Sequence, residues 1–381
     1  MMIPARTLIA CAALLLAASA PASADILIGA AGPFSGPNAA LGEQLRRGAQ
    51  MAVDDINATG GFRGERLALQ FTDDGCDPRK AVDAATGFVS AGVKAVIGHY
   101  CSGASMPASK VYEKAGIVMI TPASTHPRLT DDGGWNVLRL CPRDDAQGTA
   151  AADIVLAKFP GRKIAILNDQ SPGEAALAGR FRARLAELAI TPVFDETYKP
   201  GSKDYSDLAG RLRTAQVDVV YLAGSYVEGG LIVRQLRDAG SGAQVISGDS
   251  LVTDDFSNVA KEAGEGTLMT FTYDARKFPE ARSVLDEFKA ADYNPEGFTL
   301  YAYAAVQAWV AAAEATGGTD SARIAAWLKG GNRINTVTGN VSFDAKGDLT
   351  SPRFAWFKWI DGRYAEIDPA TLAPPVIDTT P

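Results

Sequence analysis

Between Thr72 and Thr125 the chain contains T-D-D-G-C-D-P-R-K-A (72–81), V-I-G-H-Y-C-S-G-A-S-M-P-A-S (96–109) and V-M-I-T-P-A-S-T (118–125). The apolar runs Ala95–Gly98 and Ile117–Ile120 predict two strands, each of which stops at a loop of glycine and hydroxyl residues. Loops at the carboxyl ends of neighbouring parallel strands are where open α/β sheets bind ligands. Their backbone N–H groups and hydroxyls suit a small anion such as a carboxylate.

The same alternation of strand and helix continues on both sides of this segment. A first series comprises the strand Ile26–Ala31, a helix from Leu41 that ends at Gly60-Gly61, the strand Leu67–Thr72, the helix Pro78–Ala91, the strand Ala95–Gly98, the helix Ala108–Ala115 and the strand Ile117–Ile120. Successive strand–helix units with right-handed crossovers predict a parallel α/β sheet.

A second series begins near Pro142 and has comparable length. Its predicted strands are Lys163–Asn168, Pro192–Glu196, Val217–Ala223, Gln244–Ser247 and Thr267–Thr272, and its helices are Glu174–Leu188, Tyr205–Ala215, Gly229–Ala239 and Asp254–Ala263. The last third is predicted to hold the helices Glu280–Ala291, Phe298–Thr316 and Ser321–Lys329, then a paired β region with strands Gly339–Phe343 and Arg353–Ile360 and a hairpin turn at Asp361-Gly362. Two such series predict two similar lobes with a ligand cleft between them.

Residues 1–24 have the pattern of a secretory signal peptide. Arg6 precedes an apolar run from Leu8 to Ala18, and Ala22-Ser23-Ala24 fits the small-residue cleavage rule. Cys11 leaves open a lipoprotein alternative, but it lies close to Arg6 and the apolar run continues beyond it. We therefore expect cleavage after Ala24 and an exported, periplasmic protein.

No later segment is expected to cross a membrane, because the longest apolar helix, around Tyr301–Ala315, is interrupted by Gln307 and Glu314. The net charge is −7, which becomes −8 without Arg6. Lysines and arginines are scattered along the chain, so we expect no nucleic-acid partner.

Export permits a disulfide between two of the three remaining cysteines. Cys76 and Cys101 each follow a predicted strand, so their loops can meet at the same end of the sheet. Closing the loop between them would contribute about 3.5 kcal/mol in the chain-entropy model. Cys141 would then be a buried thiol, and three free thiols are the alternative.

The three quoted blocks, in this order, resemble the periplasmic substrate-binding proteins of branched-chain amino acid (Leu/Ile/Val-type) ABC transporters. The resemblance runs from Ile26 to about Ile367 and includes D-Y-S-D-L at 204–208 and S-F-D-A-K-G-D at 342–348. It implies a type I periplasmic-binding fold, an α/β architecture of two Rossmann-like lobes joined by three crossovers. The implied lobes are residues 25–141 plus 274–348 and residues 142–273 plus 349–381. The family's disulfide matches Cys76 and Cys101.

The resemblance also implies where an amino acid would bind. Ser102 and Thr125 match hydroxyl donors to the α-carboxylate, and Ala123 matches a position whose backbone touches the ligand. Asp249 stands where the family has an acidic partner for the α-ammonium, usually glutamate. The residues alone leave other roles open, namely helix capping for Ser102 and Asp249 and a local backbone bond for Thr125.

Several pocket positions depart from the family. Leu41 replaces a tyrosine, and Gly173 falls at another. Ser225 falls at a third, where the neighbouring Tyr226 is expected to take the place of the family's tyrosine. The expected wall of the pocket is completed by Phe298, Tyr100 and Cys101. For Phe298 and Leu41, plain core packing is the alternative.

No enzyme activity, cofactor or metal is expected. Of the two histidines, His126 could pair with Ser102 as in a hydrolase, but no G-x-S-x-G motif surrounds that serine. The Asp-Asp pairs lack the spacing of a calcium loop.

The predicted function is capture of a small aliphatic or aromatic amino acid and its delivery to an inner-membrane ABC permease. Two alternatives stay open, a ligand without an amino group such as an aromatic acid, and a role as ligand sensor for a membrane receptor.

Overall fold

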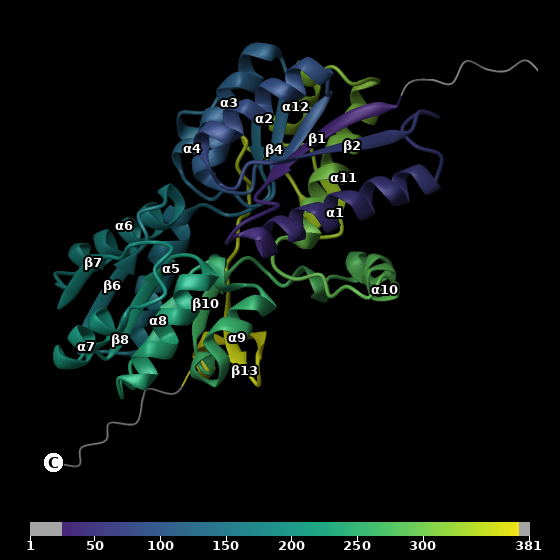
Figure 1. Cartoon of the computed structure of the whole chain (residues 1–381). Coiled ribbons are helices and arrows are strands. Elements are labelled where there is room, and N and C mark those ends of the chain that lie inside the picture. The colour runs from purple at the N-terminus through teal and green to yellow at the C-terminus, as the bar shows by residue number, and fades with distance from the viewer. Residues whose placement is uncertain (1–24, 373–381) are drawn as a thin grey trace, which may run out of the picture.

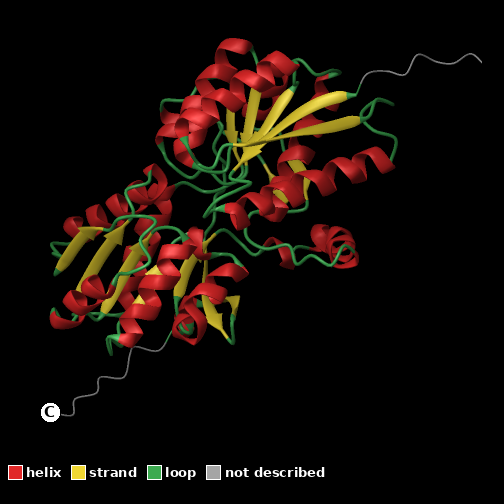
Figure 2. Cartoon of the chain, in the orientation of Figure 1, coloured by secondary structure: helices red, strands yellow, loops and turns green. Residues whose placement is uncertain are grey.

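A computed structural model describes residues 25–372 of the chain as two lobes, each a sheet with helices on both faces (Figures 1 and 2). The predicted leader with Cys11, and the tail beyond Leu372, lie outside the described residues. None of the helices in the described part combines the length and hydropathy that crossing a bilayer requires.

The first sheet has five parallel strands in the order β2-β1-β3-β4-β5. They are β1 (Ile26–Gly32), β2 (Leu67–Asp73), β3 (Ala95–Gly98), β4 (Val118–Thr121) and β5 (Val137–Arg139). β3 ends at Gly98 for a steric reason. Its φ is +126°, and a Cβ there would lie 2.4 Å from the carbonyl oxygen of Ala31 in β1.

Helices cover both faces of this sheet (Figure 1). α2 (Pro78–Ala91) and α3 (Ser102–Ala115) pack on one face, and α1 (Ala39–Ala58) and α11 (Thr299–Thr316) on the other. Alternation along β3 explains why both faces are apolar. Val96 belongs to the core beneath α2 and α3, whereas its neighbour Ile97 belongs to the core beneath α1 and α11.

The second sheet has the order β14-β13-β10-β9-β8-β6-β7. Its strands are β6 (Ile164–Asn168), β7 (Phe194–Thr197), β8 (Val219–Ala223), β9 (Gln244–Ser247), β10 (Leu268–Phe271), β13 (Ala355–Ile360) and β14 (Arg363–Ile367). β6 to β10 are parallel and repeat the strand order of the first sheet, and β13 and β14 extend it as an antiparallel hairpin. The expected doubling of the α/β unit is confirmed.

The second sheet is also covered on both faces. α5 (Asp144–Lys158) and α6 (Pro172–Glu187) lie on one side, where the ring of Phe181 stacks on Tyr221 of β8 at 3.8 Å. The other side carries α7 (Ser206–Thr214), α8 (Tyr226–Asp238) and α9 (Asp254–Ala260). The remaining helical elements are α4 (Arg128–Asp131), α10 (Arg282–Ala290), α12 (Ser321–Lys329) and the short 3-10 helices η1 (Asp249–Leu251), η2 (Lys261–Gly264), η3 (Ala275–Lys277), η4 (Pro279–Ala281) and η5 (Pro369–Thr371).

The strands near the C-terminus pair differently from the sequence-based prediction. β12 (Gly339–Val341) pairs with β11 (Ile334–Thr336) in a small separate sheet, whereas β13 joins the second sheet beside β10. The two strands predicted there therefore belong to different sheets. The hairpin turn at Asp361-Gly362 is confirmed, since it joins β13 to β14.

A buried ion pair ties β5 to the segment that leads toward β13. Arg139 is fully buried, and its Nε lies 2.6 Å from Oδ1 of Asp348. Arg143, just before α5, also reaches Asp348 at 3.0 Å. The pair of Arg143 and Asp348 joins two of the three crossovers that we predict between the lobes, which lie near Cys141–Arg143, Tyr273–Ala275 and Asp348–Ser351. The lobe limits given above stay a prediction.

Candidate functional site

The candidate ligand site is a cavity of about 140 Å³, here called the cleft cavity, between the carboxyl ends of the two sheets. Its walls are formed mainly by residues that follow β1, β2, β3 and β4 in the first sheet and β6, β8 and β9 in the second. These ends are where open α/β sheets bind ligands. The lining residues are Asn38, Leu41, Cys76, Tyr100, Cys101, Ser102, Gly103, Ala123, Thr125, Asp144, Asp169, Ser171, Pro172, Gly173, Glu174, Leu177, Ser225, Asp249 and Ser250.

Ser102 is the first residue of α3 and lies at the wall of this cavity. Cys101 holds the N-cap position, and Oγ of Ser102 accepts from the backbone N–H of His126 at 3.1 Å. The capping alternative for Ser102 is therefore wrong. Within residues 25–372, the N–H groups of Ser102 and Gly103 have no acceptor. Two free N–H groups at the start of a fourteen-residue helix suit a carboxylate.

The loop after β4 brings Ala123 and Thr125 to the same wall. The N–H of Ala123 donates to Oγ1 of Thr121 at 3.2 Å, which fixes the loop. The side chain of Thr125 faces the carboxyl of Asp144 rather than its own backbone. The hydroxyl of Thr125 thus lies between a carboxyl group and the cavity.

Asp249 approaches from the other lobe, immediately after β9. Nε2 of Gln147 donates to its Oδ1 at 3.3 Å. The N-cap of α9 is Thr253, whose hydroxyl accepts from the N–H of Asp255, so the capping alternative for Asp249 is wrong. Burial raises the pKa of Asp249 to about 6.

Tyr100, Leu41 and Cys101 line the cavity, and Ser225 does so while capping α8. Phe298 does not line it. Its ring lies behind Tyr100, edge-on at 5.6 Å, and is 3% exposed, so it supports the wall from the core. This placement agrees with the core-packing alternative.

Tyr226 does not line the cavity either. It is the first residue of α8, is buried, and its hydroxyl lies at the backbone of Ala40 near the start of α1. Tyr226 therefore contacts the other lobe beside the site. It does not take the place of the family's tyrosine at the position of Ser225.

Three carboxyl groups in the cavity were not predicted, those of Asp144, Asp169 and Glu174. Asp169 directly follows β6, and a side chain in that position of a parallel sheet could have been expected at the site. Asp144 and Glu174 lie in the first turns of α5 and α6, where an acidic residue ordinarily signals only a favourable helix start.

The predicted disulfide between Cys76 and Cys101 is present, with Cα atoms 5.4 Å apart. Both cysteines line the cavity, so the bond holds the loop after β2 against the residue that precedes Ser102. Cys141 is a buried free thiol, as expected.

The structure does not assemble the serine–histidine pair of a hydrolase. Nδ1 of His126 accepts from the N–H of Arg128 at 3.0 Å, and only the backbone of His126 contacts the hydroxyl of Ser102. His99 is fully buried between Asp74 at 2.6 Å and Tyr112 at 2.8 Å, away from the cavity. Within residues 25–372, no cluster of His, Cys, Asp and Glu side chains has the grouping of a metal site.

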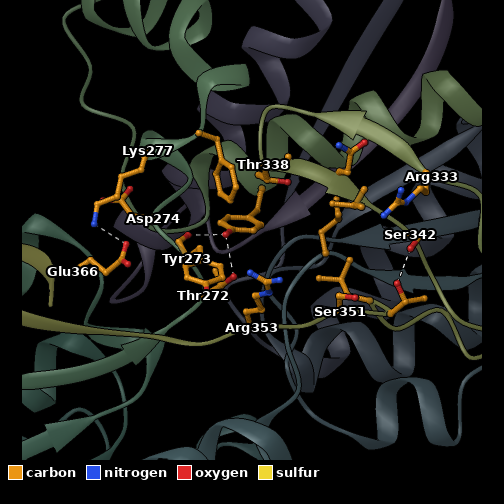
Figure 3. A pocket seen from close by; sticks show the side chains of 18 of the residues that line it. Thr272, Tyr273, Asp274, Lys277, Arg333, Thr338, Ser342, Ser351, Arg353 and Glu366 are labelled. Carbon is orange, nitrogen blue, oxygen red and sulfur yellow. Dashed lines mark hydrogen bonds and ion pairs between the residues drawn. The ribbon is translucent and has the colours of Figure 1, made fainter. Parts of the chain in front are cut away.

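A larger cavity of about 920 Å³ lies beside the segment after β10, and we call it the hinge-side cavity (Figure 3). Thr272, Tyr273, Ser351 and Arg353 are among its lining residues. None of the predicted ligand-binding residues lines it, and it lacks the helix N-terminus that faces the cleft cavity. Size therefore does not identify the site here, whereas convergent polar groups do.

Comparison with known proteins identifies the family of this chain. Residues 25–363 match the model of the family described as periplasmic binding protein. The chain is 41% identical over 355 residues to Leu/Ile/Val-binding protein homolog 1 of Brucella suis, covering 92% of this chain and 96% of that protein. It is 40% identical over 353 residues to a protein of Pseudomonas aeruginosa named amino acid binding protein, covering 92% and 94%.

A solved structure supports the same assignment. The branched-chain amino acid transporter substrate-binding protein LivJ of Streptococcus pneumoniae, in complex with isoleucine, superposes with a TM-score of 0.82. It is 27% identical and covers 90% of this chain and all of its own. The chain therefore belongs to the periplasmic binding protein family.

Proposed function

We propose that this protein captures a free α-amino acid in the cleft cavity and delivers it to an ABC permease. One observation carries the proposal: hydroxyl and N–H donors of one lobe and the carboxyl of Asp249 from the other converge on a single cavity. A zwitterion needs this pairing of donors and an acceptor, because enclosing its charges is costly unless each is hydrogen-bonded. The names of the Brucella and Streptococcus relatives make aliphatic amino acids the first candidates.

The proposed function also includes export of the protein from the cytoplasm. Export through residues 1–24 and cleavage after Ala24 would place the mature protein where an inner-membrane permease can receive it. Binding requires no covalent step, only a ligand that contacts the closed arrangement of the lobes better than the open one.

An aromatic acid without an amino group is less favoured. Such a ligand would bring one negative charge into a cavity that contains four carboxyl groups, those of Asp144, Asp169, Glu174 and Asp249. The carboxylate of the ligand would be repelled by these carboxyl groups. Without an amino group, the ligand would offer them no cation in return, so it would match the cavity poorly.

A thermal-shift screen of residues 25–381 against amino acids and aromatic acids tests the proposal. An amino acid present at a hundred times its Kd should stabilise the protein by about 2.7 kcal/mol, which raises Tm by several degrees. A screen in which benzoate-type acids stabilise the protein and amino acids do not would contradict it.

Gly103 of α3 and Pro172 of α6 lie close together at the wall of the cleft cavity. A Cβ at Gly103 would lie 3.1 Å from Cγ of Pro172 across the cleft, so a larger side chain must push the lobes apart. We expect Gly103→Leu to weaken amino acid binding by about 1–3 kcal/mol, roughly five- to 150-fold in Kd.

Calorimetry with the mature protein measures this loss. Gly87→Leu is the matched control, because a side chain at this exposed position of α2 meets nothing within 4 Å. Equal Kd values for the two variants would show that amino acid binding does not require the close approach of Gly103 to Pro172.

A further inference from the structure

The cleft cavity holds more carboxyl groups than one α-ammonium group requires. Asp144, Asp169, Glu174 and Asp249 each contribute a carboxyl group from a different position around it. In the described part of the chain, no lysine, arginine or histidine lines this cavity. If Asp249 accepts from the α-ammonium, the other three carboxyl groups are left without a cationic partner from the protein.

Two of these groups also have an oxygen that is buried and unbonded. Asp144 is 1% exposed, and its Oδ2 has no hydrogen-bond partner. Oε2 of Glu174 is likewise buried without a partner, although Oε1 accepts from the hydroxyl of Ser250. A buried acceptor left unsatisfied costs roughly 1–3 kcal/mol, so these oxygens are places for donors of a ligand.

Arg139, the arginine that interacts with Asp144, does not supply these donors. Arg139 interacts with Asp144 electrostatically, but it is bonded to Asp348 and does not line the cavity. Burial raises the pKa of Glu174, and the neighbouring Asp169 and Asp249 raise it further. A positively charged group among these carboxyl groups would favour the ionised form of Glu174 and so lower its pKa again.

We propose that the cavity prefers α-amino acids whose side chain ends in a second positive charge, an amine or a guanidine. The inference rests on the function proposed above, and it assigns the second charge to Glu174 and Asp169. Both belong to the segment from the end of β6 to the first turn of α6, so they flank one part of the wall. Asp169 is held in place by the N–H of Ser171, which donates to its Oδ1 at 2.9 Å.

Paired ligands that differ only in charge provide the test. Calorimetry of the mature protein with arginine and citrulline, and with lysine and norleucine, compares a charged side chain with a neutral one of similar shape. We expect each charged member to bind roughly tenfold to a hundredfold more tightly than its neutral partner, as for a hydrogen bond to a charged group.

The outcomes separate the two proposals. If citrulline and norleucine bind as tightly as arginine and lysine, or more tightly, the preference for a second charge is wrong and the amino acid function stands. If none of the four binds and leucine also fails, both proposals are contradicted.

A variant locates the recognition within the cavity. Glu174→Gln keeps the shape of the side chain and should reduce the preference for arginine over citrulline by roughly tenfold or more. Glu187→Gln on the same helix is the control, because that residue is exposed and pairs with Arg180 and Arg184. Unchanged norleucine binding verifies that the Glu174 variant is folded, and an unchanged arginine preference in it would overturn the assignment.

Discussion

Asp249→Ala should abolish most amino acid binding while the protein remains folded. Truncating one partner of a buried, hydrogen-bonded charge pair costs about 2–5 kcal/mol, which is roughly thirtyfold or more in Kd. The cost arises because the α-ammonium of the ligand would be left without its acceptor on the second lobe. Folding should not suffer, since Thr253 rather than Asp249 caps α9.

The pH dependence of binding follows from the same residue. Burial raises the pKa of Asp249 to about 6, so its carboxyl is protonated at pH 5 and ionised at pH 7.5. Affinity for an amino acid should therefore increase as the pH rises through 6. A raised carboxyl pKa also means that the unliganded protein loses stability as the pH rises from about 4 through 6, a loss that Asp249→Asn should remove.

Calorimetry at several pH values, with unfolding curves of the free proteins, measures both effects. Asp207→Asn is a suitable control because the side chain of Asp207 is 88% exposed on α7. Wild-type affinity in Asp249→Ala would remove Asp249 from the binding site.

Loss of the disulfide should produce the largest change in stability. Replacing Cys76 and Cys101 together by serine frees a loop with a sequence separation of 25, which costs about 3.5 kcal/mol in the chain-entropy model. Because Cys101 is the N-cap of α3 and both cysteines line the cavity, ligand binding should weaken as well.

Denaturant unfolding of the mature protein measures the free-energy difference. Cys141→Ala is the control, since it removes a buried thiol and leaves the disulfide intact. A double variant that unfolds within about 1 kcal/mol of the wild-type protein would contradict the stabilising role assigned to this bond.

The sequence predicted the parallel strands well because each is a short apolar run that ends at a polar loop. β3 and β9 have the bounds expected from their residues, and so does α2, which begins at a proline and ends before Gly92. The pattern is strong where a strand buries both of its faces or a helix carries standard end signals.

Other elements have weaker patterns. α3 begins at Ser102, six residues earlier than predicted, because its first turn is made of small polar residues. Ser105 is fully buried in that turn and is bonded to Ser124 at 2.6 Å, a contact that periodicity cannot reveal. α5 was not predicted because its buried side consists of small and polar residues, with Val155 as the one larger aliphatic side chain. α4 and the three-residue strand β5 were not predicted either.

The site could be predicted only in part. Ser102, Thr125 and Asp249 were expected from their places after strands and from the family pattern, and they do face one cavity. Whether the other acidic residues reach the cavity depends on the orientation of α6 and on how the two lobes meet. Glu174 reaches the cavity only because α6 begins opposite α3, and Phe298 is displaced from it because Tyr100 lies in front.

A crystal structure of the mature protein with its tightest-binding amino acid tests the central claim directly. We expect the ligand carboxylate within hydrogen-bond distance of Ser102 and Thr125 and its α-ammonium within hydrogen-bond distance of Asp249. A ligand found in the hinge-side cavity, or one in the cleft cavity that contacts neither the two hydroxyls nor Asp249, would contradict it.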